Sequence, residues 1–401
     1  MALTDVQIEQ IIAGAISELS NKDVKIANSG VWLCDTAEEA IRAASSAQKM
    51  LSKMTLEKRG TLIDAMRRAS LENAEYLAKL ANEETGYGRV KDKIAKNILA
   101  AEKTPGIEDL EAKAYTGDYG LTLVEAAPYG VVGSITPSTN PTSTVINNSI
   151  SMIAAGNAVV YNPHPAAKRA SQESMRVLNE AIEAAGGPKT LITTVKEPTL
   201  ESGKVIMESC DVPILSITGG EAVVNIAMRT GKKVIAAGPG NPPVIVDDTA
   251  DIAKAAKDIV DGASFDNNVV CIAEKEVFAF SNIADKLIDN MQANGAYKVS
   301  GADIDKIIST VLVKKDGAYV INRKYVGRDA AVILKDSGIA FTCDPRLIIA
   351  EVKKDHPFIR TEMLMPVLGI VRVNDINEAV FEAISAEQGC QHSAMIHSTN
   401  I

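Results

Sequence analysis

The stretch VVGSITPSTNPTSTVINNSISMIAAGNAVVYNPHP, residues 131–165, decides the fold class of this chain. It holds two apolar runs that suit strands, VVGSI (131–135) and NAVVY (157–161), on either side of a helical run, TVINNSISMIAAG (144–156). Two strands joined through a helix are expected to pair in parallel, because a parallel pair needs a long crossover connection. The segment therefore predicts one unit of a parallel sheet.

The same alternation continues along the chain in two blocks, which are separated by GPGNPPVIVDD (238–248). Further strands are expected at LITTV (191–195), VPILSI (212–217) and KVIAA (233–237) in the first block, and at EVFAF (276–280), RLIIAEV (346–352) and VLGIVRV (367–373) in the second. The chain is thus predicted to be α/β, with helices covering two parallel sheets. Because ligands bind beyond the carboxyl ends of such strands, the loops TPSTNPTS, NPHPAA and TGGEA are the candidate binding loops.

Composition narrows the classes of function. A chain of 401 residues with 46% hydrophobic positions can bury more than one core. Its net charge of -9 is spread along the chain, which argues against a nucleic-acid partner. The five cysteines show no metal-ligand or disulfide spacing, so no metal is expected and a reducing cytosol fits best. No apolar run approaches the roughly 20 residues that a membrane span needs, so no membrane role is expected.

The segment FDNNVVCIAEKE (265–276) places Cys271 between apolar residues, after two asparagines and ahead of a charged run. A free cysteine is more often a small packing residue than a nucleophile. The residues from Phe265 to Asn268 suit neither a helix nor a strand interior, so Cys271 is expected in a turn where backbone N–H groups can point at a bound oxygen. A Cys–His hydrolase stays possible, with His164, His356, His392 or His397 as the partner.

The TGG at 218–220 follows an apolar strand and precedes a helix, which would let a phosphate approach backbone N–H groups. Glycines are common at such junctions, so the motif alone is weak. No G-x-G-x-x-G follows a strand, and any dinucleotide must bind without the usual Rossmann fingerprint.

Taken in order, six segments closely resemble the coenzyme A-acylating members of the aldehyde dehydrogenase superfamily: ITPSTNPT, NPHPAAK, SITGGEAVV, AAGPGNPPVIVDDTAD, GASFDNNVVCIAEKE and TEMLMPVL. The nearest members look like the acetaldehyde and propionaldehyde enzymes of bacterial microcompartments that use ethanolamine or propanediol. The resemblance implies an aldehyde dehydrogenase fold, with a Rossmann-like cofactor domain and a second α/β catalytic domain. It also implies a short-chain aldehyde as substrate, with NAD and coenzyme A.

The resemblance assigns roles to particular residues. Cys271 matches the nucleophile that carries the acyl group as a thioester, and Asn140 matches the side-chain donor to the oxyanion. Glu362 matches the glutamate that holds the nicotinamide ribose. The cofactor loops it implies contain Thr136, Pro137, Ser138, Pro163, His164, Thr218, Gly219 and Gly220. Without the resemblance, Asn140 would be a turn residue before proline and Glu362 a surface carboxylate.

Two departures from the wider superfamily favour thiolysis over hydrolysis. Ala237 lies nearest the position of the glutamate that activates water in hydrolytic members, and a thiol, unlike water, is partly ionised unaided. Asn162 replaces the lysine that holds the adenosine ribose, and the site is expected to accept NAD and coenzyme A in turn. The alternatives are a hydrolytic aldehyde dehydrogenase and an inactive truncated protein that only docks on a shell.

The N-terminal segment has Thr4 and Gln7 at capping-box spacing and apolar residues at helical spacing, which predicts an amphipathic helix. It could dock on its own domain, but it resembles the encapsulation peptides that bind microcompartment shell proteins. A location in the bacterial cytoplasm, inside a microcompartment, follows from that resemblance. Acetaldehyde is expected as the preferred substrate over propionaldehyde, because ETGYGRVKDKIAKN and GLTLVEAAPYGVV look more like the ethanolamine-type enzymes.

The expected organisation has five parts: an encapsulation-type helix at 1–19, a linker at 20–34, an NAD- and coenzyme A-binding domain at 35–238 with bridging strands near 107–126, a catalytic domain at 239–385, and a segment at 386–401 that returns to the cofactor domain. Relatives continue past QHSAMIHSTNI through a final segment that supplies a subunit-bridging strand. That oligomerisation tail is expected to be absent here, while a homo-oligomer is expected for the full-length family.

Overall fold

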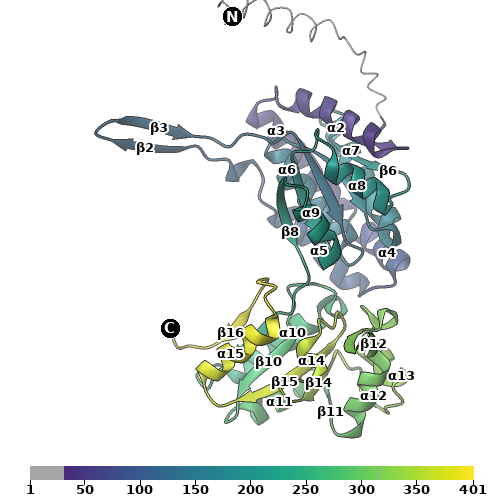
Figure 1. The fold of residues 1–401 in the computed structure, drawn as a ribbon, viewed down its shortest axis with the longest axis vertical. Coiled ribbons are helices and arrows are strands. Elements are labelled where there is room, and N and C mark those ends of the chain that lie inside the picture. The colour runs from purple at the N-terminus through teal and green to yellow at the C-terminus, as the bar shows by residue number, and fades with distance from the viewer. Residues whose placement is uncertain (1–30, 316) are drawn as a thin grey trace, which may run out of the picture.

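The computed structural model describes residues 31–315 and 317–401, so the helix predicted at 1–19 and most of the linker lie outside the described residues. Two six-stranded sheets dominate the fold and lie one above the other in Figure 1. The first has the order β1-β6-β5-β4-β7-β8 and the second β11-β14-β15-β10-β9-β16. Every pairing in both sheets is parallel.

The first domain contains the elements up to β8. Its strands are β1 (Leu33–Cys34), β2 (Lys113–Gly117), β3 (Gly120–Val124), β4 (Val131–Thr136), β5 (Ala158–Pro163), β6 (Ile192–Val195), β7 (Ile214–Thr218) and β8 (Lys233–Ala237). Its helices are α2 (Ala37–Leu51), α3 (Leu56–Glu72), α4 (Ala74–Thr85), α5 (Val90–Lys103), α6 (Pro141–Ala154), α7 (Lys168–Ala184), α8 (Leu200–Glu208) and α9 (Glu221–Met228), with 3-10 turns η1 (Ile107–Asp109) and η2 (Pro165–Ala167).

The second domain contains the remaining elements. Its strands are β9 (Pro243–Val246), β10 (Glu276–Phe280), β11 (Ala296–Val299), β12 (Leu312–Lys315), β13 (Ala318–Ile321), β14 (Leu347–Glu351), β15 (Val367–Val373) and β16 (Met395–His397). Its helices are α10 (Ile252–Ser264), α11 (Ala284–Ala293), α12 (Ala302–Val311), α13 (Ala330–Asp336), α14 (Pro357–Arg360) and α15 (Ile376–Glu387), with 3-10 turns η3 (Phe265–Asn268) and η4 (Arg323–Tyr325).

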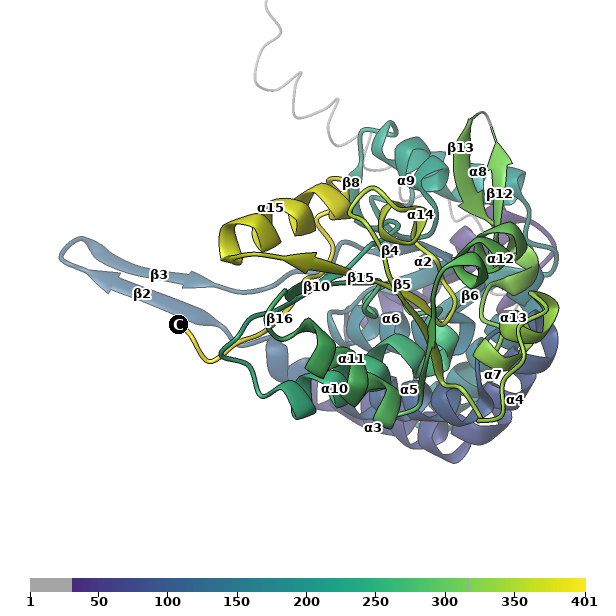
Figure 2. The same ribbon diagram turned by 90° about the horizontal axis from the view of Figure 1, so that it is seen from below.

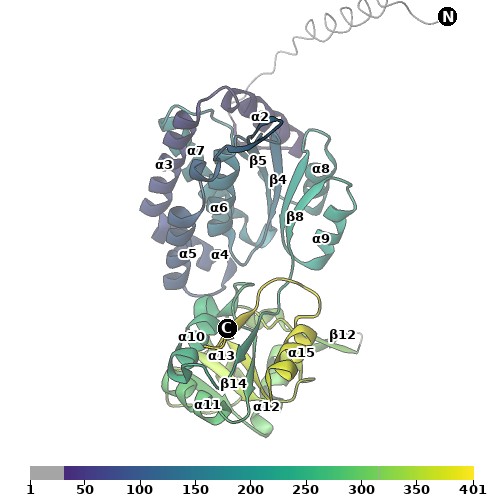
Figure 3. The ribbon, with the colours of Figure 1, turned by 90° about the vertical axis from the view of Figure 1, so that its left-hand side faces the viewer.

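Helices cover both faces of the first sheet, as its apolar strands require. Helices α2 and α8 pack on one face, α6 and α7 pack on the other, and α3, α4 and α5 form an outer layer over α6 and α7. Figure 3 shows this outer layer on one side of the sheet and α8 on the opposite side. Thr36 and Glu39 form a capping box at the start of α2.

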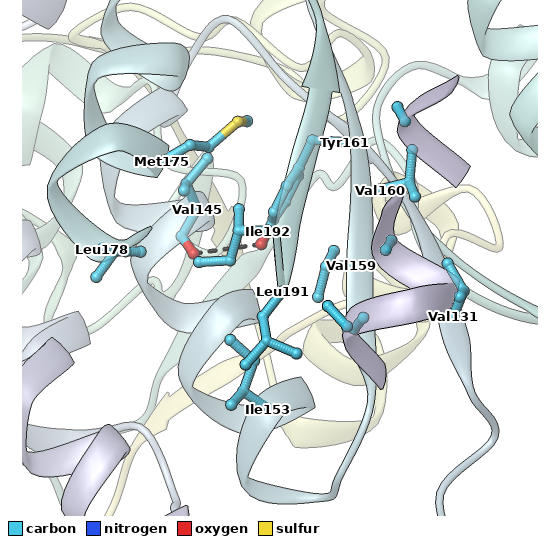
Figure 4. Packing of buried hydrophobic residues seen from close by; sticks show 14 of the residues in the cluster. Val131, Val145, Ile153, Val159, Val160, Tyr161, Met175, Leu178, Leu191 and Ile192 are labelled. Carbon is cyan, nitrogen blue, oxygen red and sulfur yellow. Dashed lines mark hydrogen bonds between the residues drawn. The ribbon is translucent and has the colours of Figure 1, made fainter. Parts of the chain in front are cut away.

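The core of the first domain lies between the sheet and α6 and α7 (Figure 4). Tyr161 is fully buried there, and its hydroxyl group lies 2.9 Å from Ser149 Oγ and donates to the carbonyl oxygen of Val145 at 3.3 Å. Burying the hydroxyl group without such partners would cost about 1–3 kcal/mol, so these contacts allow the phenol side chain to fill the core. The core in turn fixes the loops that follow β4 and β5.

The second domain departs from the sequence prediction at three places. Strand β9 lies inside GPGNPPVIVDD, the stretch expected only to separate the two blocks, so Cys271 comes before the second strand of this domain. The short strands β11, β12 and β13 were not predicted, because their few residues show little alternation. Residues 386–401 were expected to return to the first domain, and this is wrong for β16, which pairs with β9 in the second sheet.

The hairpin β2–β3 falls inside the predicted 107–126 region and projects from the first domain (Figures 1 and 2).

We predict that Ile153→Ala lowers the free energy of unfolding of the first domain by about 2–5 kcal/mol, because Ile153 is fully buried in its core. Guanidinium unfolding followed by the fluorescence of Trp32 measures this, since the single tryptophan packs against the same core. The matched control is Leu99→Ala on α5, where the side chain is 61% exposed and the change should stay within about 0.5 kcal/mol. Equal losses in the two variants would contradict this assignment of the core.

Candidate active site

A cavity of about 430 Å³ lies where the loops of the first sheet face the loop that carries Cys271. The sequential strands β4 to β8 lie in the order β6-β5-β4-β7-β8, so the chain changes direction in the sheet between β4 and β7. Crevices form at such points, beyond the carboxyl ends of the strands. The loops after these two strands line the cavity, together with the loops after β5 and β8.

All residues assigned to the site from the sequence line this one cavity. The set comprises Thr136, Pro137, Ser138, Asn140, Pro163, His164, Thr218, Gly219, Gly220, Cys271 and Glu362. The three candidate binding loops therefore converge, although they are far apart in sequence. Ala237 and Asn162, the two departures from the wider superfamily, line the cavity as well.

The turn before the cysteine explains the asparagines. Asp266, Asn267 and Asn268 have φ angles of 47°, 54° and 63°, a left-handed backbone that Asp and Asn tolerate better than most residues. All three are buried, and Asn267 Nδ2 donates to the carbonyl oxygen of Gly327 at 2.9 Å, while Asn268 Nδ2 donates to that of Ala263 at 2.8 Å. The predicted turn is present, but its polar residues are interior ones that hold the backbone in shape.

Lys275 explains the charged run after the cysteine. It is buried, and its Nζ donates to the carbonyl oxygens of Asn268 at 3.1 Å and Val270 at 3.0 Å. Burial lowers the pKa of Lys275 to about 8, against the attraction of Glu362 and other nearby acids. The ammonium group thus binds two carbonyl oxygens of the turn and helps to fix the backbone that leads to Cys271.

Opposing influences act on the pKa of the Cys271 thiol. Burial raises its pKa, the carboxylate of Glu362 raises it further, and Lys275 and the backbone N–H groups of Cys271 and Ile272 lower it. The side chain is only partly buried, so the sulfur stays open to the cavity. Glu362 is itself affected by burial, which raises its pKa, while Lys275 lowers it.

Several cavity features suit a dinucleotide and an acyl-thiol carrier. A Cβ atom added to Gly219 or Gly220 would meet no atom within 4 Å, so the backbone there is open to a close ligand. These glycines precede α9, and the N-terminus of a helix favours phosphate. Arg323 lines the cavity near His164, and burial followed by this arginine lowers the pKa of His164. The residues therefore fit a negatively charged ligand that reaches the second domain.

The sequence did not identify several residues around the site, including Arg323, Lys275, Asp266 and Lys96. Lys96 and Asp266 meet only through contacts between distant segments, which no local pattern marks. Lys275 contacts the turn just before it, but a lysine in a charged run does not by itself signal a buried role. His392 also lies beside the cysteine loop, since a Cβ atom on Gly240 would lie 2.9 Å from the Cys271 carbonyl oxygen and 3.0 Å from His392 Cγ. Within the described residues, no hydrogen bond joins Cys271 to any histidine, so the structure gives no support to a Cys–His hydrolase.

The described part of the chain shows neither a metal site nor a membrane-spanning helix. Among residues 31–315 and 317–401, no group of His, Cys, Asp and Glu side chains is arranged to hold a metal ion. No helix in these ranges combines the length and the apolar character needed to cross a bilayer.

The family model described as the aldehyde dehydrogenase family matches residues 26–401. The chain belongs to the aldehyde dehydrogenase family. The resemblance and the fold predicted from the sequence are confirmed by this match and by similar solved structures.

Three similar aldehyde dehydrogenases narrow the comparison. An acetaldehyde dehydrogenase (acetylating) of Bilophila wadsworthia is 50% identical over 377 residues, which cover 92% of this chain and 78% of the relative. The propionaldehyde dehydrogenase of the Clostridium phytofermentans fucose utilisation bacterial microcompartment has a TM-score of 0.89 and 47% identity, covering 92% and 84% of the two chains. That of Rhodopseudomonas palustris, solved with bound coenzyme A and an acylated cysteine, has a TM-score of 0.89 and 43% identity, covering 92% and 84%.

We predict that Glu362→Gln moves the alkylation of Cys271 by iodoacetamide to lower pH. The carboxylate raises the pKa of the thiol, so its removal lets the reactive thiolate form at lower pH. Mass spectrometry of the peptide that contains Cys271 measures the rate, since Cys210, Cys343 and Cys390 are exposed and also react. Glu208→Gln, at an exposed carboxylate on α8, is the control and should leave the profile in place. A profile for Glu362→Gln that overlays the wild type would show that this carboxylate does not govern the thiol.

Proposed function

We propose that this protein oxidises a short-chain aldehyde with NAD and transfers the acyl group to coenzyme A through a thioester on Cys271. The observation that carries the proposal is the composition of the cavity. Cys271 and Asn140 face a common space in which Glu362 is the single carboxylate among the described lining residues. The similar proteins of Bilophila wadsworthia and Clostridium phytofermentans, an acetylating acetaldehyde dehydrogenase and a propionaldehyde dehydrogenase, support this reaction class.

In the proposed reaction the sulfur of Cys271 attacks the aldehyde carbon as a thiolate, after its proton has passed to solvent. A carbon–sulfur bond forms, and the carbonyl oxygen becomes an oxyanion. The side-chain amide of Asn140 and the backbone N–H of Cys271 donate to this oxyanion, and each donor in comparable sites contributes about 3 kcal/mol. These donors act on charge that develops during the reaction, so they accelerate the chemical step.

A nicotinamide dinucleotide would accept the hydride that leaves the aldehyde carbon, and the oxyanion then closes to the thioester. Glu362 would hold the nicotinamide ribose, and the open backbone at Gly219 and Gly220 would lie against the phosphates. The choice of NAD over NADP is part of the proposal. Asn162 lines the cavity where the wider superfamily has the lysine that holds the adenosine ribose, and we expect this edge to accept NAD and coenzyme A in turn.

Ala237 favours coenzyme A over water as the acceptor. It lies in the cavity at the position nearest the water-activating glutamate of hydrolytic members, and a methyl group cannot remove a proton from water. The thiol of coenzyme A needs no such base, because part of it ionises near neutral pH. Attack by that thiolate on the thioester carbon forms the new carbon–sulfur bond and returns Cys271 as the leaving thiolate.

We predict that NADH formation from acetaldehyde and NAD stops after one turnover when coenzyme A is absent and continues when it is added. Mass spectrometry of the protein before addition should find the acyl group on the peptide that contains Cys271, and Cys271→Ala should abolish both the adduct and the NADH. A full NADH rate without coenzyme A would instead support the hydrolytic alternative. Run over several aldehydes, the same assay should give the highest kcat/KM for acetaldehyde, with propionaldehyde lower.

We also propose that residues 1–19 dock the enzyme on a microcompartment shell, which would place it inside the compartment in the bacterial cytoplasm. The support is the amphipathic pattern of the sequence and the microcompartment origin of the Clostridium phytofermentans relative. Residues 1–19 fused to a fluorescent protein should concentrate in shells in cells that make them. Replacing Ile8, Ile11 and Ile12 by Asp removes the apolar stripe and should leave the fusion diffuse; retention in the shells would contradict the proposal.

Assembly into a homo-oligomer stays a prediction. Exposed apolar side chains lie on the β2–β3 hairpin and on α15, which point to the same side of the molecule in Figures 1 and 2. They include Tyr115, Leu121, Leu123, Phe381 and Ile384. Exposed apolar side chains of this kind are typical of protein interfaces, and we expect subunits to meet there.

A further inference from the structure

Asn140 is held in place by a lysine that the sequence pattern did not identify. Lys96 on α5 donates from Nζ to Asn140 Oδ1 at 2.6 Å, and the same Nζ forms an ion pair with Asp266 Oδ2. The Lys96 side chain is 10% exposed and that of Asp266 is fully buried. A charge-assisted hydrogen bond of this kind is stronger than a neutral one, and solvent does not compete for it.

This contact decides which way the amide of Asn140 points. An ammonium group has donors only, so it can bind the carbonyl oxygen of the amide and not its NH₂ group. The NH₂ group is then fixed on the opposite side, where one hydrogen goes to Thr139 Oγ1 at 3.1 Å. The amide has two hydrogens, which leaves one for a ligand in the cavity. Without Lys96 the amide could rotate and present its oxygen to a developing oxyanion.

The same network joins the two domains. Lys93, one turn before Lys96 on α5, also binds Asp266 Oδ2, at 3.1 Å, and the backbone N–H of Arg89 donates to Asp266 Oδ1 at 2.7 Å. Asp266 precedes Cys271 by only a short turn. The buried carboxylate of Asp266 therefore connects α5, whose Lys96 binds Asn140, to the loop that carries the sulfur of Cys271.

We propose that Lys96 is a positioning residue for the acylation step: anchored by Asp266, it orients the amide of Asn140 so that its free N–H meets the oxyanion formed at Cys271. This inference rests on the proposed function and adds a residue to it. Lys96 acts through Asn140 and touches neither the sulfur nor the substrate in the proposed arrangement. Its effect should therefore vanish when the amide is gone.

A double-mutant cycle tests this dependence. The readout is the rate of the first NADH turnover with acetaldehyde and NAD in the absence of coenzyme A, which isolates acylation. Asn140→Ala should lower this rate about 100-fold or more. Lys96→Met should lower it about 10-fold or more in the wild-type background, but less than about 2-fold in the Asn140→Ala background.

Lys93→Met is the matched control. Lys93 is more deeply buried than Lys96, with 3% against 10% of its side chain exposed, and binds the same carboxylate, but it makes no described contact with Asn140. If Lys93→Met lowers the rate of the first NADH turnover through stability or charge, its fold-loss should multiply with the fold-loss caused by Asn140→Ala. Should Lys96→Met fail to fold, Lys96→Gln replaces it in the cycle; its amide can donate to Asn140, so its loss should be smaller.

The outcomes separate the two proposals. A wild-type protein that gives no NADH turnover with any short-chain aldehyde overturns the proposed function. An active wild type in which the Lys96 and Asn140 effects multiply, as those of Lys93 and Asn140 do, overturns the positioning role and leaves the proposed function standing. A Lys96 effect that disappears in the Asn140→Ala background supports the inference.

Discussion

The geometry of the site depends on the ion pairs that the fully buried carboxylate of Asp266 forms with Lys93 and Lys96. Removing a carboxylate from water costs several kcal/mol, and two lysines together with a backbone N–H offset that cost here. Burial and then the charge of Lys93 lower the pKa of Lys96 while Asp266 opposes both, and the resulting pKa is about 8. Since the first domain supplies Asn140 and the second supplies Cys271, this ion-pair network sets the distance between the two halves of the proposed oxyanion site.

The cysteine loop is shaped by a second constraint, its left-handed backbone. Three successive residues with positive φ turn the chain sharply between α10 and the sulfur of Cys271. The buried side-chain amide of Asn268 and the ammonium group of Lys275 stabilise that turn through hydrogen bonds to backbone carbonyl groups. Burial then raises the pKa of the thiol. In the proposed reaction this has a consequence for the intermediate: a sulfur of high pKa is a poorer leaving group, so the thioester waits for a strong nucleophile such as a second thiolate.

The sequence predicted the architecture well wherever strands were long and apolar. The strands from β4 to β7 and the pair β14 and β15 are mostly buried and flanked by clear helices, so their pattern carried the parallel fold. Strand β8 was also predicted from its apolar run, although its residues are exposed or half-buried. Strand β16 could not be placed, because its three residues, two half-buried and one exposed, gain their strand character from pairing with β9, far away in the sequence. The residues assigned to the site came from the resemblance carried by six short segments, and the fold brings those segments together around one cavity.

Lys96 could not be found in that way, although its helix carries an anomaly. On α5 the buried stripe consists of Lys93, Asn97 and Ala101, with Lys96 nearly buried beside it, while Leu99 is exposed. An isolated helix of this sequence would be expected to turn its lysines to water, so periodicity alone gives the wrong inward face. The polar face is stable only because Asp266 and Asn140 lie opposite it, and both come from other parts of the chain. A helix whose inward stripe is charged therefore signals a partner that its own sequence does not contain.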